Sequence, residues 1–121
     1  MNMTDKLRGR MGEALCAEHL RKKGYELLAS GYRSRFGEID LIAKKRGIVA
    51  FVEVKLRRDD RFAAAMEQVG PQKQERIRKT ALAWIAQNGD ALQPRFDVCE
   101  VYLPEDGDAR AAKINYLEDA F

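Results

Sequence analysis

Residues 37–55 read GEIDLIAKKRGIVAFVEVK, and this stretch decides the fold that we expect. Two apolar runs flank a short polar turn, and the second run is rich in β-branched residues, which is typical of neighbouring strands. If Arg46 and Gly47 alone form the turn, paired positions sum to 93 and Asp40 faces Glu53. A four-residue turn, 44–47, makes the same two acids diagonal neighbours. Both registers predict a β-hairpin.

The hairpin gathers ionisable side chains on one face in either register. Because side chains alternate along a strand, we expect Asp40, Glu53 and Lys55 to project together. Two adjacent carboxylates among apolar residues repel each other unless a cation neutralises them. Mg²⁺ accepts one or two carboxylates, keeps several waters and binds phosphate oxygens. The pattern therefore predicts a site for phosphodiester hydrolysis; the alternative is an exposed strand that carries an ordinary Glu-x-Lys pair.

A helix is predicted before the hairpin. It covers residues 4–23, with Thr4 as N-cap and Gly24 just beyond its end. Its apolar residues recur at helical spacing: Leu7, Met11, Ala14, Leu15 and Leu20. Residues 25–35 then predict a first strand, with a polar end.

A second long helix is predicted after the hairpin, and it opens at Pro71 and ends at Gly89. Its apolar stripe is Ile77, Ala81, Trp84 and Ile85. Residues 57–70 are ambiguous between a loop and a short helix, and residues 95–103 and 111–117 predict two further strands. The order αβββαββ predicts one α/β domain over residues 1–121, with a central mixed sheet flanked by helices.

The residue inventory excludes several kinds of active site. His19 is the only histidine, neither serine lies in a nucleophile elbow, and there is no phosphate-binding glycine loop. Cys16 and Cys99 are expected to be reduced and buried, which favours a cytoplasmic location. No apolar run is long enough for a membrane span, and the amino terminus does not resemble a secretory signal.

Charge is distributed unevenly along the chain. Residues 90–121 carry a net charge of −5, and residues 1–89 carry +8. A basic segment of this size suggests a polyanionic partner such as nucleic acid. The alternative, an ordinary solvated surface, is equally compatible with charge alone.

The hairpin motifs GEIDLI, residues 37–42, and FVEVK, residues 51–55, resemble the PD-(D/E)xK nuclease superfamily. More narrowly, the chain resembles the bacterial YraN-like family of uncharacterised proteins, UPF0102. The resemblance continues through Gly9-x-x-Gly12-Glu13, Gly24-Tyr25, Lys73-Gln74, Arg95-Phe96-Asp97-Val98 and Asp119-Ala120-Phe121. It implies a restriction-endonuclease-like fold close to that of archaeal Holliday-junction resolvases. Ile39 stands where the superfamily pattern has a nominal proline.

The resemblance also implies roles for single residues. Asp40 and Glu53 match the metal-binding acids, and Lys55 matches the active-site lysine. Glu13 matches an additional helix-borne acid of resolvase-like members; its alternative is an exposed helical glutamate. The implied cofactor is Mg²⁺ or Mn²⁺. The implied function is a metal-dependent endonuclease acting on DNA, with branched or structured DNA as the candidate substrate.

Further residues are candidates for contacts with the nucleic-acid backbone. The four arginines that flank the acids are Arg33, Arg35, Arg57 and Arg58, and the predicted helix start adds Lys73 and Gln74. Trp84 is interpreted as a core residue and Asp97 as a structural acid. Two alternatives to the endonuclease remain: a non-catalytic nucleic-acid-binding module, and an interaction subunit of a repair complex. A double-strand cut requires two sites, so a homodimer is expected by analogy.

Overall fold

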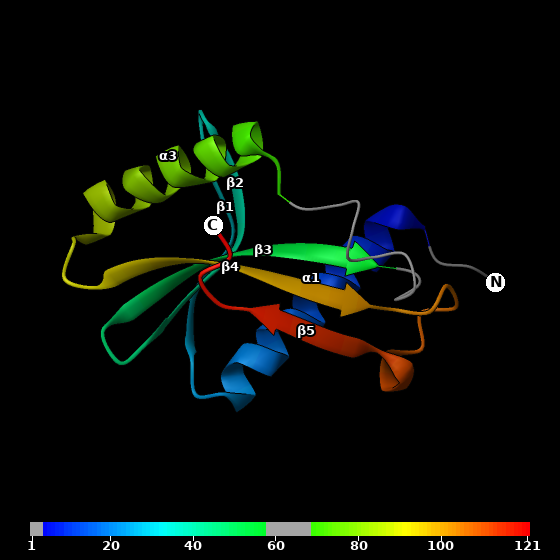
Figure 1. Ribbon diagram of the computed structural model, residues 1–121. Helices are drawn as coiled ribbons and strands as arrows, with labels where there is room; N and C mark the ends of the chain where they lie inside the picture. Colours follow the sequence, from blue (N-terminus) through cyan, green and yellow to red (C-terminus); the bar gives the residue numbers. More distant parts are fainter. Residues whose placement is uncertain (1–3, 58–68) are drawn as a thin grey trace.

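The hairpin of residues 37–55 forms the centre of a five-stranded sheet in the computed structural model, which describes residues 4–57 and 69–121 (Figure 1). In chain order the elements are α1 (Asp5–Lys22), β1 (Glu26–Ser34), β2 (Gly37–Lys45), β3 (Ile48–Arg57), α3 (Pro71–Asn88), β4 (Gln93–Tyr102), the 3₁₀ helix η1 (Ala109–Ala111) and β5 (Lys113–Leu117). The α/β class and the order αβββαββ are confirmed. The ambiguous stretch after β3 falls mostly outside the described residues, and so does Arg58.

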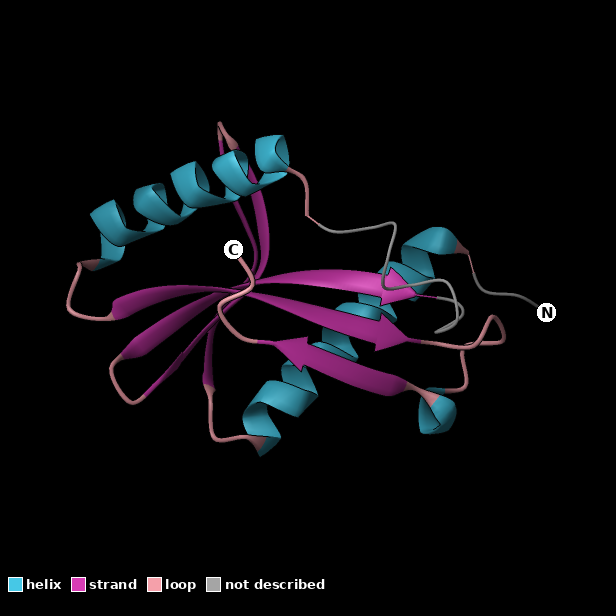
Figure 2. Cartoon of the chain, in the orientation of Figure 1, coloured by secondary structure: helices cyan, strands magenta, loops and turns pink. Residues whose placement is uncertain are grey.

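The sheet is mixed, and its strands follow the order of the sequence from β1 to β5. Neighbouring strands are antiparallel, except for β3 and β4, which run parallel. The parallel pair needs a crossover connection, and α3 lies within that connection (Figure 2).

Each face of the sheet is covered by one helix (Figures 1 and 2). Under α1 the core contains Leu41, Val52 and Cys99, and under α3 it contains Ile42, Phe51 and Trp84. The predicted core role of Trp84 is confirmed, and its ring meets that of Phe51 edge to face. Odd-numbered residues of β3 therefore face α3, and even-numbered residues face α1.

The predicted apolar face of α1 is wrong in part. Leu7 is 49% exposed, whereas Arg8 and Gly12 are buried against the sheet. A Cβ at Gly12 would lie 3.1 Å from Leu56 Cδ1, so the missing side chain lets the helix approach β3 closely. Arg8 donates hydrogen bonds to the carbonyl oxygens of Leu103 and Pro104. Hydrophobic periodicity does not detect a contact face built from glycine and a hydrogen-bonded arginine.

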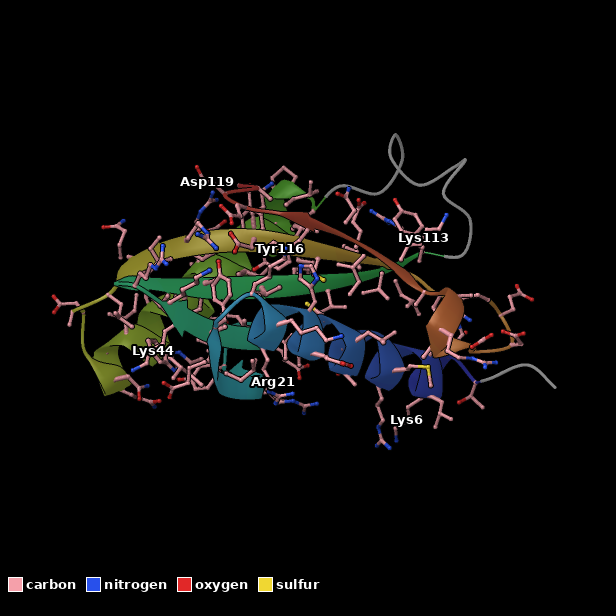
Figure 3. All side chains as sticks on the ribbon, turned by 90° about the horizontal axis from the view of Figure 1, so that it is seen from below. Lys6, Arg21, Lys44, Lys113, Tyr116 and Asp119 are labelled. Atoms are coloured by element: carbon pink, nitrogen blue, oxygen red, sulfur yellow. The ribbon has the colours of Figure 1, made fainter. Side chains whose placement is uncertain are left out.

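Figure 3 views the molecule from the side of α1, which crosses the sheet with Lys6 and Arg21 pointing away from the strands. Tyr116, on β5, stacks on the ring of His19, on α1. Cys16 and Cys99 are free thiols and buried between this helix and the sheet, as expected. Among the described helices, none is long and apolar enough to cross a membrane.

Candidate active site

The two-residue turn is the one that the chain adopts. Arg46 and Gly47 both have positive φ, 50° and 80°, as a type I′ turn requires. The β2–β3 ladder runs from Lys45 paired with Ile48 to Leu41 paired with Val52. Paired positions thus sum to 93, as predicted for this turn.

The ladder ends one step before the predicted pairing of Asp40 with Glu53, because β2 separates from β3 at Asp40. Asp40 Oδ2 accepts a hydrogen bond of 2.8 Å from the Val54 amide, so a carboxylate takes the position of a strand carbonyl. On the other side, Asp40 lies opposite Gly31 of β1, whose φ is +66°. β1 and β2 bend together at this point, and the end of the hairpin that joins them lies toward α3 (Figure 1). Asp40 therefore sits in the fork between β2 and β3.

Glu53 faces this fork from β3 and is only 7% exposed. Its carboxyl group lies within hydrogen-bonding reach of Asp40, although the two residues are not ladder partners. Burial, the hydrogen bond with Asp40 and the negative charge of Asp40 raise the pKa of Glu53 to about 7, against the opposing charge of Lys73. The expected convergence of the two acids is thus present.

Glu13 approaches the same fork from the other face of the sheet. It is half-buried on α1, one residue beyond the closely packed Gly12. Burial raises the pKa of Glu13, and so do the charges of Asp40 and Glu38 and a hydrogen bond with Asp40. Asp40 is therefore the centre of a cluster of carboxyl groups from α1, β2 and β3.

Two lysines accompany these acids. Lys73, in the first turn of α3, places its Nζ 3.2 Å from Glu53 Oε2. Lys55 is half-buried on the same face of β3 as Glu53, and within residues 4–57 and 69–121 it forms no ion pair. In the described part of the chain, the carboxylates of the cluster thus have Lys73 in an ion pair, Arg10 as a positive charge near Glu13, and Lys55 two residues along β3 from Glu53.

Glu100 is a buried acid beside this site that the sequence pattern did not single out. The parallel register places it next to Lys55, and it is 7% exposed. Its carboxylate accepts hydrogen bonds from Asn115 Nδ2 at 2.9 Å and from Arg57 Nη2 at 3.0 Å. Only the pairing of β3 with β4 reveals this neighbour, because nothing in the local sequence specifies a parallel register.

The predicted backbone contacts are dispersed. Arg33 and Arg35 are exposed near the tip of the β1–β2 hairpin, where Arg33 lies 3.7 Å from Glu38. Arg57 is 6% exposed and held by Glu100, which gives it a structural partner. Gln74 donates to the Val69 carbonyl at the start of α3. Their contacts with phosphate stay predictions.

The potential metal ligands of the cluster are all carboxylate oxygens, which suit a hard cation such as Mg²⁺ or Mn²⁺. Among the described residues, no three His, Cys, Asp or Glu side chains are arranged to hold a metal ion. A cation with one or two carboxylate ligands and several waters fits this arrangement, whereas a full protein cage does not.

Residues 12–101 match the model of a family described as "Uncharacterised protein family UPF0102". A UPF0102 protein of Syntrophus aciditrophicus is 42% identical over 98% of this chain and 92% of its own length. A UPF0102 protein of Caldicellulosiruptor bescii is 44% identical over 93% of this chain and 95% of its own length. A third, from Nocardia farcinica, is 47% identical over 78% of this chain and 76% of its own.

Proposed function

We propose that this chain, which belongs to the UPF0102 family, is a divalent-metal-dependent endonuclease that hydrolyses phosphodiester bonds in DNA. The observation that carries the proposal is the meeting of Asp40, Glu53 and Glu13 in the fork between β2 and β3. Folding gains nothing from carboxyl groups crowded together out of water, so a function that requires them is the simplest reason for their presence. The resemblance of the hairpin motifs to PD-(D/E)xK nucleases supports the same reaction.

Asp40 and Glu53 are the residues that would hold the cation, and Glu13 would act on the water shell of the cation rather than as a third ligand. When bound, Mg²⁺ or Mn²⁺ supplies an activated water and neutralises charge on the scissile phosphate. The Val54 amide donates to Asp40 Oδ2 and so holds one oxygen of this carboxylate in place. This hydrogen bond orients the carboxylate before substrate arrives.

Lys55 is assigned to the substrate rather than to the acids. It forms no ion pair within the described part of the chain, so its ammonium group is available to a phosphate oxygen or an attacking water. Lys73 contacts Glu53, and it would exchange this partner for the DNA backbone when a cation neutralises the acid. Lys55 projects from β3 on the face of the sheet that α3 covers, and Lys73 reaches the same side from α3 itself.

Cleavage assays test the proposal. The purified protein should cut junction, flap, single-stranded or duplex DNA in Mg²⁺ or Mn²⁺, and EDTA should stop the reaction. Lys55→Ala should lower the rate by about 100-fold or more, as loss of a proton-transfer or charge-stabilising group does. Lys113→Ala, an exposed lysine of β5, is the matched control and should cut at the normal rate. Cleavage that survives unchanged in Lys55→Ala would reveal a contaminant and contradict the assignment.

A second candidate is a nucleic-acid-binding or repair-complex module that keeps the fold without turnover. The observation in its favour is the ion pair between Lys73 and Glu53, because a lysine can neutralise the buried acid permanently. Binding that weakens steeply with salt, with no cleavage of any substrate in either metal, would support it. A cytoplasmic location and a homodimer remain proposals, and sedimentation of the protein with and without DNA tests the latter.

A further inference from the structure

We propose that the tip of the β1–β2 hairpin, residues 34–37, recognises unpaired bases, with the ring of Phe36 stacking on a base close to the acidic cluster. The proposal rests on the proposed nuclease function, and it names the substrate class: DNA with splayed or single-stranded nucleotides, as at a fork or junction. Four observations carry it: the exposure of the ring, the support under the turn, the surrounding cations and the distance to Asp40.

Phe36 is an exposed aromatic residue at the end of a hairpin. Its exposed fraction is 36%, and the other exposed large apolar side chains in the described part of the chain are the leucines Leu7, Leu82 and Leu117. A ring in this position loses contact with water when a base covers it, and every base offers a flat face. Stacking of this kind tolerates any sequence and requires a base outside the duplex stack.

The turn that carries Phe36 is held against α3. The Phe36 amide donates to Ser34 Oγ at 3.0 Å, and Ser34 Oγ lies 3.0 Å from Thr80 Oγ1. Gly37 lies against the same helix, and a Cβ there would be in ordinary van der Waals contact with Arg76 Cβ, at 3.5 Å. The ring is therefore presented by a supported turn, which lowers the entropy lost on binding.

Cations surround the ring. The guanidinium carbon of Arg35 lies 4.9 Å from the ring centroid, and Lys79 Nζ lies 5.7 Å from it. Lys79 also pairs with Glu75, but Arg35 and Arg76 have no acidic partner among the described residues. Arg35 and Lys79 lie over the ring, and Arg35 has no acidic partner in the described part of the chain. An aromatic side chain combined with such cations is an arrangement that proteins use for single-stranded nucleic acid. The competing interpretation is a set of cation–π contacts that serves only to hold the turn.

The tip is close enough to the acids to act on the same substrate. Phe36 and Asp40 are four residues apart in sequence, and β2 connects them; an extended strand spans about 13 Å over that separation. A base held at the hairpin tip would thus lie a few nucleotides from a phosphate bound beside Asp40, between β2 and β3. This geometry selects DNA in which pairing is interrupted near the cleaved bond.

Binding measurements without divalent metal test the proposal independently of cleavage. Fluorescence anisotropy in EDTA compares a forked DNA with a fully paired duplex of the same sequence. Phe36→Ala and Phe36→Leu should weaken fork binding by about 5- to 100-fold and change duplex binding less than about twofold. Phe36→Trp should retain fork binding. Leu82→Ala, at a more exposed apolar residue of α3 (65% exposed, against 36% for Phe36), is the control and should leave both affinities unchanged.

A fluorescent base analogue at the branch point provides a direct readout. Its emission should be quenched by the wild-type protein and by Phe36→Trp, but not by Phe36→Leu, which keeps an apolar side chain without a ring face. Fork affinity that is unchanged in Phe36→Leu, or an equal loss for fork and duplex, overturns the stacking proposal. Fork-selective binding by a protein that cuts nothing in Mg²⁺ would instead reject the nuclease and leave the stacking proposal intact.

Discussion

Two buried acids on neighbouring strands, Glu53 and Asp97, have opposite environments. The β3–β4 register places Glu53 beside Val98 and Val52 beside Asp97, so the acids are one step apart and face opposite sides of the sheet. Asp97 is fully buried and accepts hydrogen bonds from Arg95, the Tyr116 hydroxyl and the Asp119 amide. Glu53 has the neighbouring Asp40 carboxyl and one exposed lysine.

The difference separates a structural acid from a functional one. Three hydrogen-bond donors make the Asp97 carboxylate part of the fold. The hydrogen bond to Asp97 in turn raises the pKa of Arg95, because it stabilises the charged guanidinium. The charged form of Glu53 is instead disfavoured by burial and by the neighbouring Asp40, and a bound cation would offset both effects. Buried acids of the first kind should be needed for stability, whereas those of the second kind should cost stability.

The largest effect is expected at Asp97. Asp97→Ala leaves the Arg95 guanidinium and the Tyr116 hydroxyl without their acceptor, and this should lower the free energy of unfolding by about 3–5 kcal/mol. Urea denaturation followed by circular dichroism measures the change. Asp90→Ala, at an exposed position, is the control and should stay within about 0.5 kcal/mol of wild type. A small change at Asp97 would contradict its structural role.

Glu53→Gln should raise the free energy of unfolding at alkaline pH, whereas Asp97→Ala should lower it. The folded pKa of Glu53, about 7, lies above its unfolded value of about 4.3, so folding favours the protonated acid. The favourable contribution of protonated Glu53 to the stability of the fold is fully present below pH ~4.3. This contribution declines as the pH rises and is lost above about pH 7. At pH 8 the variant should therefore be more stable than wild type, by an amount on the order of 3–4 kcal/mol.

The pH dependence of the difference provides the check. The stability of Glu53→Gln relative to wild type should grow between about pH 4.3 and 7 and then level off. Adding Mg²⁺ at pH 8 should stabilise wild type and not the variant, because only the charged acid binds the ion. A variant that is less stable than wild type at pH 8 would place Glu53 in the same class as Asp97.

The sequence predicts the hairpin and its acids because the information is local. Gly47, with positive φ, specifies the turn, and the alternation of side-chain direction along each strand specifies the shared face. The fork at Asp40 was not predicted, since it depends on the bend at Gly31 and on the packing of the hairpin tip against α3. The full set of partners of Asp97 was equally hidden, because Tyr116 and Asp119 reach it only after β5 pairs with β4.

The buried arginines show the same limit of local patterns. Arg8 and Arg57 look like surface charges in the sequence, but both are buried and donate to groups that are distant along the chain. Composition gives no signal for such residues, because their acceptors are a loop carbonyl and an acid on a parallel strand. The family resemblance supplied Glu13, whose place near Asp40 also depends on tertiary packing.

The smallest effect is expected at Lys73, and it tests how firmly the lysine satisfies Glu53. Lys73→Met removes the cation that competes with a metal ion for this carboxylate while keeping an apolar side chain of similar length. At pH 8.5, where Glu53 is charged, the variant should bind Mn²⁺ about three- to tenfold more tightly, roughly 1 kcal/mol, by calorimetry. Lys79→Met removes a surface pair with Glu75 and a cation–π contact with Phe36 but no contact with the acids, and it should leave Mn²⁺ affinity unchanged. Weaker binding in Lys73→Met alone would mean that the lysine orders the acid for the metal, and Glu53 would then have a built-in partner as Asp97 does.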